Sequence, residues 1–287
     1  YLFNYHYFQK QYENDIVKNN DEEKTKQLKK LVTPFILRRN KKEVLTELPD
    51  KIEQNIILPF NDEEEKLYVA NLAKANKELQ ELYDIEGSDK MQILKLLTRL
   101  RQLCLEPRLV YDNIDQPSSK LKACMELIKT MQENKQKVLL FSSFTSVLDL
   151  IAEECQKAGI TYYMLTGSTN KEDRRELVSR FQKDDTTVFL ISLKAGGTGL
   201  NLTSAEAVIH FDPWWNVSAQ NQATDRAYRI GQKNNVQVFN LVMKDSVEEK
   251  IIELQKRKKE LADMFVENNS GGLSQMSKED ILSLFTM

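Results

Sequence analysis

Five short apolar segments after residue 130 constrain the fold of this chain more than any other feature of its sequence. They are Val138–Phe141, Tyr162–Leu165, Val188–Ile191, Ala207–Phe211 and Val236–Val242. Segments with helical spacing of apolar residues alternate with them, at Lys120–Glu133, Ser146–Lys157, Lys171–Gln182 and Ala219–Tyr228. Continuous apolar strands that alternate with helices predict a parallel sheet covered on both faces, which is an α/β fold.

The residues before this alternation read as mostly helical, since only Gly87 of the nine glycines precedes Gly159. Asn61 or Asp62 can cap a helix whose first turn is acidic and whose apolar residues Leu67, Ala70, Leu79 and Leu82 recur at roughly helical spacing. A second helix is predicted at Met91–Cys104, with Leu94, Leu97 and Leu100 on one face. The stretch Ile85–Lys90 is the predicted turn between them.

Further helix signals lie later in the chain. Thr169 and Glu172 have the spacing of a capping box at the start of the Lys171–Gln182 helix. A charged helix is predicted from about Val247 to Val266, followed by a Ser/Gly linker at Asn268–Ser274 and a short helix at Lys278–Phe285.

Composition excludes several classes of protein. The 41 Lys and Arg and 43 Asp and Glu give a net charge of −2, so a polyanion site requires local clustering, as in the carboxylate-free basic stretch Lys24–Lys42. Three scattered cysteines and two histidines argue against a zinc or haem site and suit a reducing cytosol. No apolar run approaches the roughly 18 residues of a membrane span. The chain starts at Tyr1 and not at Met, so we expect a piece of a longer protein.

A glycine-rich segment, Ser192–Asn201, directly follows the apolar run Val188–Ile191. Ligands of parallel sheets bind beyond the carboxyl ends of the strands, and glycines allow backbone N–H groups to approach a phosphate closely. Lys194, Thr198 and Asn201 could add hydrogen bonds. The alternative is a tight turn that needs glycine only for its backbone angles.

A second polar segment contains Gln222, Asp225, Arg226 and Arg229. On a helix the glutamine and the two arginines would project from one face, where paired guanidiniums suit a phosphate. The alternative is a surface helix on which Asp225 pairs with Arg229.

The order of these motifs resembles the second ATPase lobe of the Swi/Snf family of DNA translocases, within the helicases that share RecA-like lobes. The motifs are Phe141–Thr145, Leu165–Ser168, the glycine segment, His210–Asn216 and the arginine segment ending in Ile230-Gly231-Gln232, and Leu37–Val44 with Glu47–Lys51 resembles the entry into that lobe. The resemblance covers about Leu31 to Leu261 and looks bacterial. One departure is Val217, where the family commonly has proline.

The resemblance implies roles for individual residues. Arg229 would be the arginine finger, with Arg226 and Gln222 as its catalytic helpers. ATP would be bound by Gly197, Gly199, Asn201, Asp225, Arg226 and Arg229. The DNA backbone would be contacted by Ser143, Phe144, Thr145, Thr166, Gly167, Ser168, Lys194, Ala195, Gly196, Thr198 and Trp214. Core packing is the alternative for Trp214 and Trp215, and a packed connector is the alternative for the basic stretch.

The resemblance also implies a domain plan: the end of the first lobe at 1–25, a connector and helical protrusion at 26–118, the RecA-like lobe at 119–245 and C-terminal helices at 246–287. No phosphate-binding G-x-x-x-x-G-K-[ST] motif occurs in the chain, so ATP with Mg²⁺ would be held mainly by a first lobe elsewhere in the same polypeptide, and the isolated chain should be inactive. The expected partners are that lobe, double-stranded DNA and a DNA-bound target protein, in a bacterial cytoplasm at the nucleoid and without a membrane. A strand-separating helicase lobe and a non-enzymatic DNA- or protein-binding module remain the alternatives.

Overall fold

The computed structural model describes residues 5–13, 15–16, 21–32, 49–83, 90–196, 200–264 and 284–285. The chain divides into two compact units, one with residues 1–47 and 256–269 and the other with 48–255 and 270–287. The smaller unit contains α1 (Tyr5–Phe8), the π-helix η1 (Gln9–Glu13) and α3 (Glu22–Val32). Asp21 caps α3, since its Oδ1 accepts hydrogen bonds from the N–H groups of Glu23 and Lys24.

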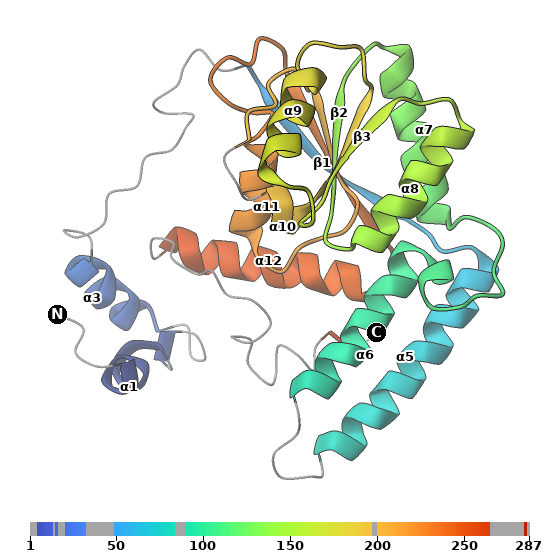
Figure 1. Cartoon of the computed structure of the whole chain (residues 1–287). Helices are drawn as coiled ribbons and strands as arrows, with labels where there is room; N and C mark the ends of the chain where they lie inside the picture. The colour runs from blue at the N-terminus through green and yellow to red at the C-terminus, as the bar shows by residue number, and fades with distance from the viewer. Residues whose placement is uncertain are drawn as a thin grey trace. The chain divides into compact units, whose positions relative to one another are not determined.

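The larger unit is built around a six-stranded parallel sheet in the order β1-β6-β5-β2-β4-β3 (Figure 1). The strands are β1 (Lys51–Leu58), β2 (Val138–Ser142), β3 (Tyr162–Leu165), β4 (Val188–Ser192), β5 (Ala207–His210) and β6 (Val236–Met243). Every residue of β2, β4 and β5 is buried, as continuous apolar strands in a parallel sheet require. The predicted α/β fold with its RecA-like sheet is therefore confirmed.

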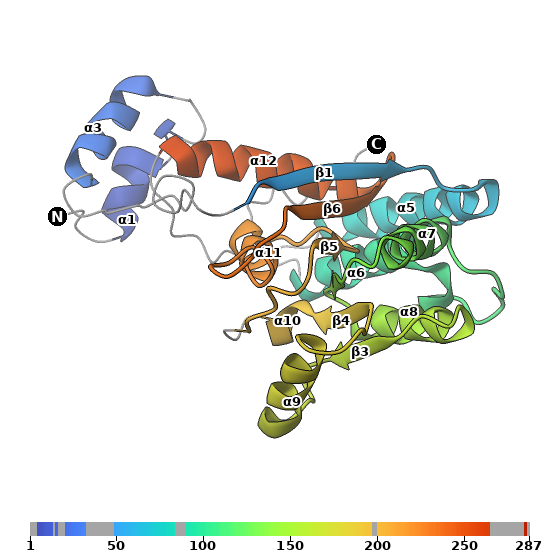
Figure 2. The same ribbon diagram turned by 90° about the horizontal axis from the view of Figure 1, so that it is seen from above.

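Helices cover both faces of the sheet (Figure 2). On one face α7 (Ser119–Glu133) and α8 (Thr145–Lys157) pack on one apolar cluster with the strands. On the other face α9 (Lys171–Phe181), the single turn α10 (Leu193–Gly196) and α11 (Val217–Thr224) pack on a second cluster. Gly159, at φ +68°, ends α8 in a left-handed conformation that suits glycine.

A helical hairpin extends from the sheet. It consists of α5 (Asp62–Tyr83) and α6 (Lys90–Leu105), followed by the 3-10 turn η3 (Pro107–Leu109). Asn61 Oδ1 accepts hydrogen bonds from Glu63 N and Glu64 N, so the predicted cap is Asn61. A third apolar cluster joins both helices to the first turns of α12 (Val247–Met264).

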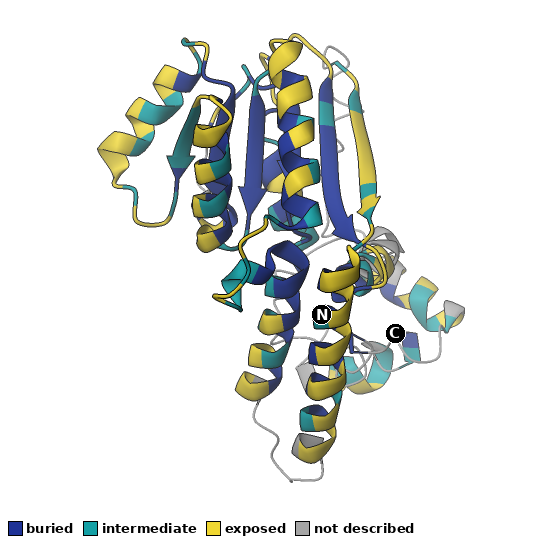
Figure 3. Ribbon diagram, turned by 90° about the vertical axis from the view of Figure 1, so that its right-hand side faces the viewer, coloured by how far each residue is buried: buried dark blue, intermediate teal, exposed yellow. Residues whose placement is uncertain are grey.

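The strand β1 is absent from the sequence prediction. It pairs with β6 in the register Lys51↔Val236 to Leu58↔Met243 and forms the edge of the sheet. Its residues are largely exposed, and Figure 3 shows it as the mostly yellow strand beside the buried ones. Charged and amide residues dominate the N-terminal part of β1, at Lys51, Glu53, Gln54 and Asn55, so its sequence lacks the apolar run by which the other five strands were found.

Three other sequence predictions differ from the structure. The buried stripe of α5 is Tyr68, Leu72, Ala75 and Leu79, so Ala70 faces solvent. On α6, Leu94 is exposed while Leu97 and Leu100 are buried. The cap of α9 is Asn170, whose side chain accepts from Asp173 N, because Thr169 Oγ1 instead accepts from Thr166 N in the preceding turn.

Several predicted segments lie outside the described residues. They are 33–48, which holds the end of the basic stretch and the lobe-entry motif, 84–89 of the predicted turn, the linker 268–274, and the last predicted helix except for Leu284 and Phe285. Among the described helices, none is both long and apolar enough to cross a membrane. The domain boundaries inferred from the resemblance stay a prediction.

Candidate functional site

The loops that follow β2, β4 and β5 meet at one edge of the sheet. Ser142 pairs with Ser192 and Phe141 pairs with His210, so these three strands end at the same level. This shared carboxyl edge brings the segments at 143–145, 192–196 and 211–216 together, as their positions after the apolar strands predict.

The arginine segment is a turn and not a helix. The predicted helix Ala219–Tyr228 ends at Thr224, and Asp225 is its C-cap. Beyond it, Arg226 N and Ala227 N donate to carbonyls three residues back, and Arg229 N donates to Ala227 O. The expectation that Gln222, Arg226 and Arg229 share one helix face is therefore wrong. Gln222 lies exposed on α11, and both arginines lie on the turn that follows it.

Long-range hydrogen bonds hold this arginine turn (225–232). Leu202 N, just after the glycine segment, donates to Arg226 O at 3.0 Å. The buried Gln232 side chain donates to Ala205 O at 2.8 Å and to Ala227 O at 3.2 Å. Gly231 has φ +102°, a backbone angle that side-chain-bearing residues rarely adopt. The ending Ile230-Gly231-Gln232 thus fixes the turn against the loop before β5.

The two arginines form a positive site at the protein surface. Arg226 and Asp225 are half-buried, and Arg229 is exposed. Burial lowers the pKa of Arg226, and the nearby charge of Arg229 lowers it further, whereas Asp225 raises it. Two guanidiniums that disfavour each other's charge gain most from an anion between them, so the turn fits a phosphate group.

Polar contacts beneath α11 fix where this turn begins. Thr224 Oγ1 lies 2.9 Å from His210 Nε2, and both groups are buried. Gln220 Nε2 donates to Asn240 Oδ1 at 3.0 Å, and Asn240 Nδ2 donates to Asn55 Oδ1 at 2.9 Å. The first turn of α11 is capped by Asn216, whose side chain accepts from Ala219 N at 3.2 Å. Val217 is thus the first helical residue, a position where the proline common in the family is optional.

The glycine segment is described up to Gly196 and from Leu200 onward. Lys194 is exposed on α10, whereas the Ala195 side chain is buried in the core and its N–H donates to Ser192 Oγ. Asn201 is exposed. The predicted contacts Gly197, Thr198 and Gly199 lie outside the described residues, so their roles stay predictions.

The predicted DNA-contacting loops lie at the ends of β2 and β3. Thr145, Gly167 and Ser168 are exposed, and Ser143, Phe144 and Thr166 are half-buried. Of the two tryptophans after β5, Trp214 is half-buried and Trp215 is 9% exposed, so Trp215 is part of the core and Trp214 reaches the surface.

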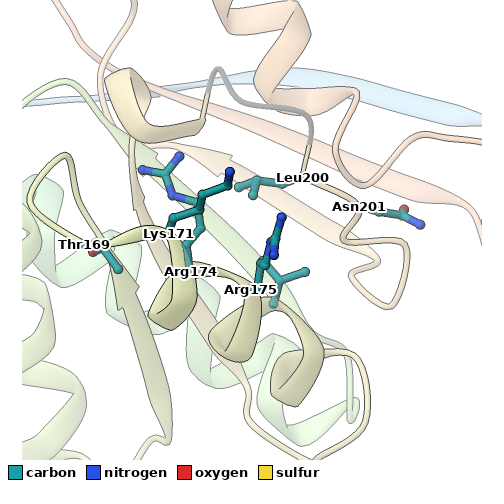
Figure 4. Close-up of a pocket in the computed structure, with 7 residues that line it drawn as sticks. Thr169, Lys171, Arg174, Arg175, Leu200 and Asn201 are labelled. Carbon is teal, nitrogen blue, oxygen red and sulfur yellow. The ribbon is translucent and has the colours of Figure 1, made fainter.

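A basic pocket of about 600 Å³ lies between α9 and the end of the glycine segment (Figure 4). Its lining comprises Thr169, Lys171, Arg174, Arg175, Val178, Leu200 and Asn201. The three basic side chains leave α9 on the side that faces Leu200, and Arg174 Nη1 donates to Ala195 O at 3.4 Å. The lining holds three cations and no carboxylate, so the pocket suits an anion.

This pocket was not predicted from the sequence, although the sequence carries a signal for it. Positions 171, 174, 175 and 178 have the i, i+3, i+4, i+7 spacing of one helix face, but acidic neighbours in the sequence hide the basic stripe. No group of metal-ligating side chains occurs among the described residues. The thiols of Cys104, Cys124 and Cys155 have pKa values raised by burial, which makes them unreactive.

A parallel sheet whose carboxyl edge gathers a glycine segment and an arginine turn defines a RecA-like lobe of the helicase type. Residues 1–109 match the SNF2-related domain, and residues 119–231 match the helicase conserved C-terminal domain. Together these matches cover most of the chain, which belongs to the SNF2-related family.

Individual relatives agree with this assignment. An uncharacterized ATP-dependent helicase of Mycoplasma pneumoniae is 38% identical over 92% of this chain and 26% of its own length. The putative ATP-dependent helicase/translocase YwqA of Bacillus subtilis is 35% identical over 98% of this chain and 31% of its own length. The SWI2/SNF2 ATPase core of Sulfolobus solfataricus in complex with dsDNA has a TM-score of 0.67 and 31% identity, covering 99% of this chain and 60% of that one. The chain thus spans less than a third of either bacterial relative.

The buried His210 gives this site a pH dependence that can be measured. Burial lowers the pKa of His210 to about 4 from 6.5, while Glu53 and Asp212 oppose the shift and Lys51 adds to it. The folded protein therefore binds fewer protons than the unfolded chain between these pH values, so stability falls as the pH drops from 6.5 toward 4. The loss should reach roughly 3 kcal/mol.

Urea unfolding at several pH values, for the wild-type chain and His210→Gln, measures this contribution. Gln keeps an amide near the Nε2 position but does not titrate. The free energy of unfolding of the wild type, minus that of His210→Gln, should decrease by roughly 3 kcal/mol between pH 7 and pH 4. A difference that is constant from pH 7 to pH 4 would mean that His210 has the same pKa in the folded and the unfolded protein.

Proposed function

We propose that this chain is the second motor lobe of an ATP-dependent double-stranded DNA translocase. The observation that carries the proposal is the arginine turn, which long-range hydrogen bonds fix beside the glycine segment at the carboxyl edge of the sheet. The match to the helicase C-terminal domain, which contains the glycine segment and both arginines, and the putative translocase among the relatives support it.

In this proposal Arg229 is the arginine finger, because it is the exposed member of the pair, and the half-buried Arg226 holds a neighbouring phosphate oxygen. Gln222, Asp225, Asn201 and the glycines 197 and 199 complete the nucleotide contacts. When bound, ATP supplies the transferable phosphoryl group and Mg²⁺ neutralises its oxygens. The Mg²⁺ ligands belong to the first lobe, so the isolated chain is not expected to hydrolyse ATP.

The proposed DNA track runs over the ends of β2, β3 and β4. Hydroxyl and N–H groups at 143–145, 166–168 and 194–198 bind phosphates without reading bases, and Trp214 packs against the backbone. The pocket on α9 adds cations next to the 166–168 loop, since Thr169 lines the pocket and its Oγ1 accepts a hydrogen bond from Thr166 N. The complex of the Sulfolobus relative with dsDNA supports duplex as the partner.

The remaining parts of the proposal concern the cell. The partners are the first lobe of the same polypeptide and a DNA-bound protein that translocation would displace. The bacterial relatives support a place on nucleoid DNA in a bacterial cytoplasm.

The arginine finger is tested by Arg229→Ala in the polypeptide that also contains the first lobe. DNA-stimulated ATP hydrolysis should fall by roughly 10³ to 10⁵, while nucleotide affinity changes much less. Arg229→Lys should fail similarly, because an ammonium lacks the planar fork of a guanidinium. Arg180→Ala, which removes an exposed arginine paired with Glu176 on α9, is the control. A near-normal kcat for Arg229→Ala would refute the finger role.

The DNA track is tested by the salt dependence of duplex binding. Affinity should be independent of base sequence, and each neutralised phosphate adds about −0.9 to the log–log slope against salt. Lys171→Gln and Arg175→Gln should each make that slope shallower by about this amount, whereas Lys183→Gln, just beyond α9, should leave it unchanged. Strong preference for one base sequence would argue for a base-reading module instead.

Translocation and strand separation predict different products. A duplex translocase displaces the third strand of a triplex but leaves a forked duplex intact under the same ATP conditions. In the polypeptide that also contains the first lobe, we expect triplex displacement only. Efficient release of a labelled strand from the fork would assign the protein to the strand-separating helicases, with Trp214 as the candidate wedge. Failure on both substrates, with no ATP turnover, would favour a non-enzymatic DNA-binding module.

A further inference from the structure

An arginine of the helical hairpin is buried among the loops at the carboxyl edge of the sheet. Arg101 of α6 is 7% exposed. Its Nη2 donates to Asp212 Oδ2 at 2.8 Å, to Ser143 Oγ at 3.0 Å and to Pro213 O at 3.3 Å. One nitrogen of the hairpin thus joins the loop after β2 to the loop after β5.

The carboxylate of Asp212 completes this connection. It is 1% exposed, and its Oδ1 accepts hydrogen bonds from Ser142 Oγ at 2.7 Å and Ser143 N at 2.9 Å. Ser143 Oγ also donates to Asp212 Oδ2. A buried carboxylate is costly without a countercharge, and the salt bridge from Arg101 supplies it.

Three aromatic rings surround the same guanidinium. Its central carbon lies 5.0 Å from the ring centroid of Phe144, 5.4 Å from that of Trp215 and 5.9 Å from that of Trp214. Arg101 Nε is buried without a hydrogen-bond partner among the described residues, so the ion pair and the rings hold the side chain. A lysine could neutralise Asp212 but could not stack in this way.

We propose that Arg101 is a positioning residue for DNA binding: it sets the conformation of the 143–145 loop and of Trp214 so that both face the duplex backbone. The inference rests on the proposed DNA track. Arg101 acts through these loops, because a side chain this deeply buried does not itself reach a phosphate.

Salt titration distinguishes such a residue from a direct phosphate ligand. In the 287-residue chain, Arg101→Met should weaken binding to a mixed-sequence duplex roughly 10-fold or more at every salt concentration, since hydrogen bonds to charged phosphates are lost. The log–log slope should stay unchanged, because no cation leaves the interface. A slope shallower by about 0.9 would instead make Arg101 a phosphate ligand. Arg101→Lys should restore part of the affinity, because it keeps the countercharge of Asp212.

Tryptophan emission reports on the same loops directly, since the chain has two tryptophans and both lie beside Arg101. Arg101→Met should shift the emission. Arg108→Met is the matched control, because it breaks the ion pair of Arg108 with the buried Glu106, near Glu153 and Glu154 at the far end of α8. It should lower thermal stability without changing emission or DNA affinity.

The outcomes separate this inference from the proposed function. A wild-type chain that does not bind duplex refutes the DNA track and the inference together. Normal affinity and emission in a folded Arg101→Met chain refute the inference alone. If Arg101→Met does not fold, Arg101→Lys keeps the countercharge of Asp212 but loses the stacking on the three rings, and wild-type affinity and emission in that variant would be equally decisive against the inference.

Discussion

The carboxyl edge of the sheet depends on a negative charge buried where β5 ends. Asp212 is buried, so its carboxylate depends on hydrogen-bond donors of the protein itself. These donors come from the loop after β2 and from the helical hairpin. The position of the hairpin relative to the sheet and the conformation of the surface loops therefore share one requirement. Loss of Arg101 would leave this buried charge without its ion-pair partner.

A second polar network links Trp214 and α11 to the sheet. Gln220 of α11 accepts from Trp214 N at 3.2 Å and donates to Asn240 of β6, which in turn donates to Asn55 of β1. The surface tryptophan, the helix that leads into the arginine turn and the edge strand are thus connected by side-chain amides. Amides are directional donors and acceptors, so the network fixes geometry as well as adding stability.

Local sequence signals predicted the parts of this fold that local chemistry decides. The apolar runs of β2 to β6 and the acidic first turn of α5 were recognised from residues within each segment. The positions of the strands in turn predict which loops lie at the carboxyl edge. The end of α11 could not be read in the same way. Asp225 to Tyr228 would suit a helix, but the bonds from Leu202 and Gln232 favour a turn there, and these depend on tertiary contacts. Likewise, no residue near Arg101 in the sequence predicts its ion pair with Asp212, which lies 111 residues away.

The edge position of β1 bears on the order in which the chain folds. Asn55 and Asn240 are 185 residues apart, whereas β2 to β5 pair within a much shorter stretch. Closing a long loop costs chain entropy before it yields contacts, so we expect β1 to join the sheet last, although it is synthesised first. Until then its backbone groups lack strand partners and could template association with another chain. The charged and amide side chains of β1, such as Lys51, Glu53 and Gln54, oppose that association before the strand pairs with β6.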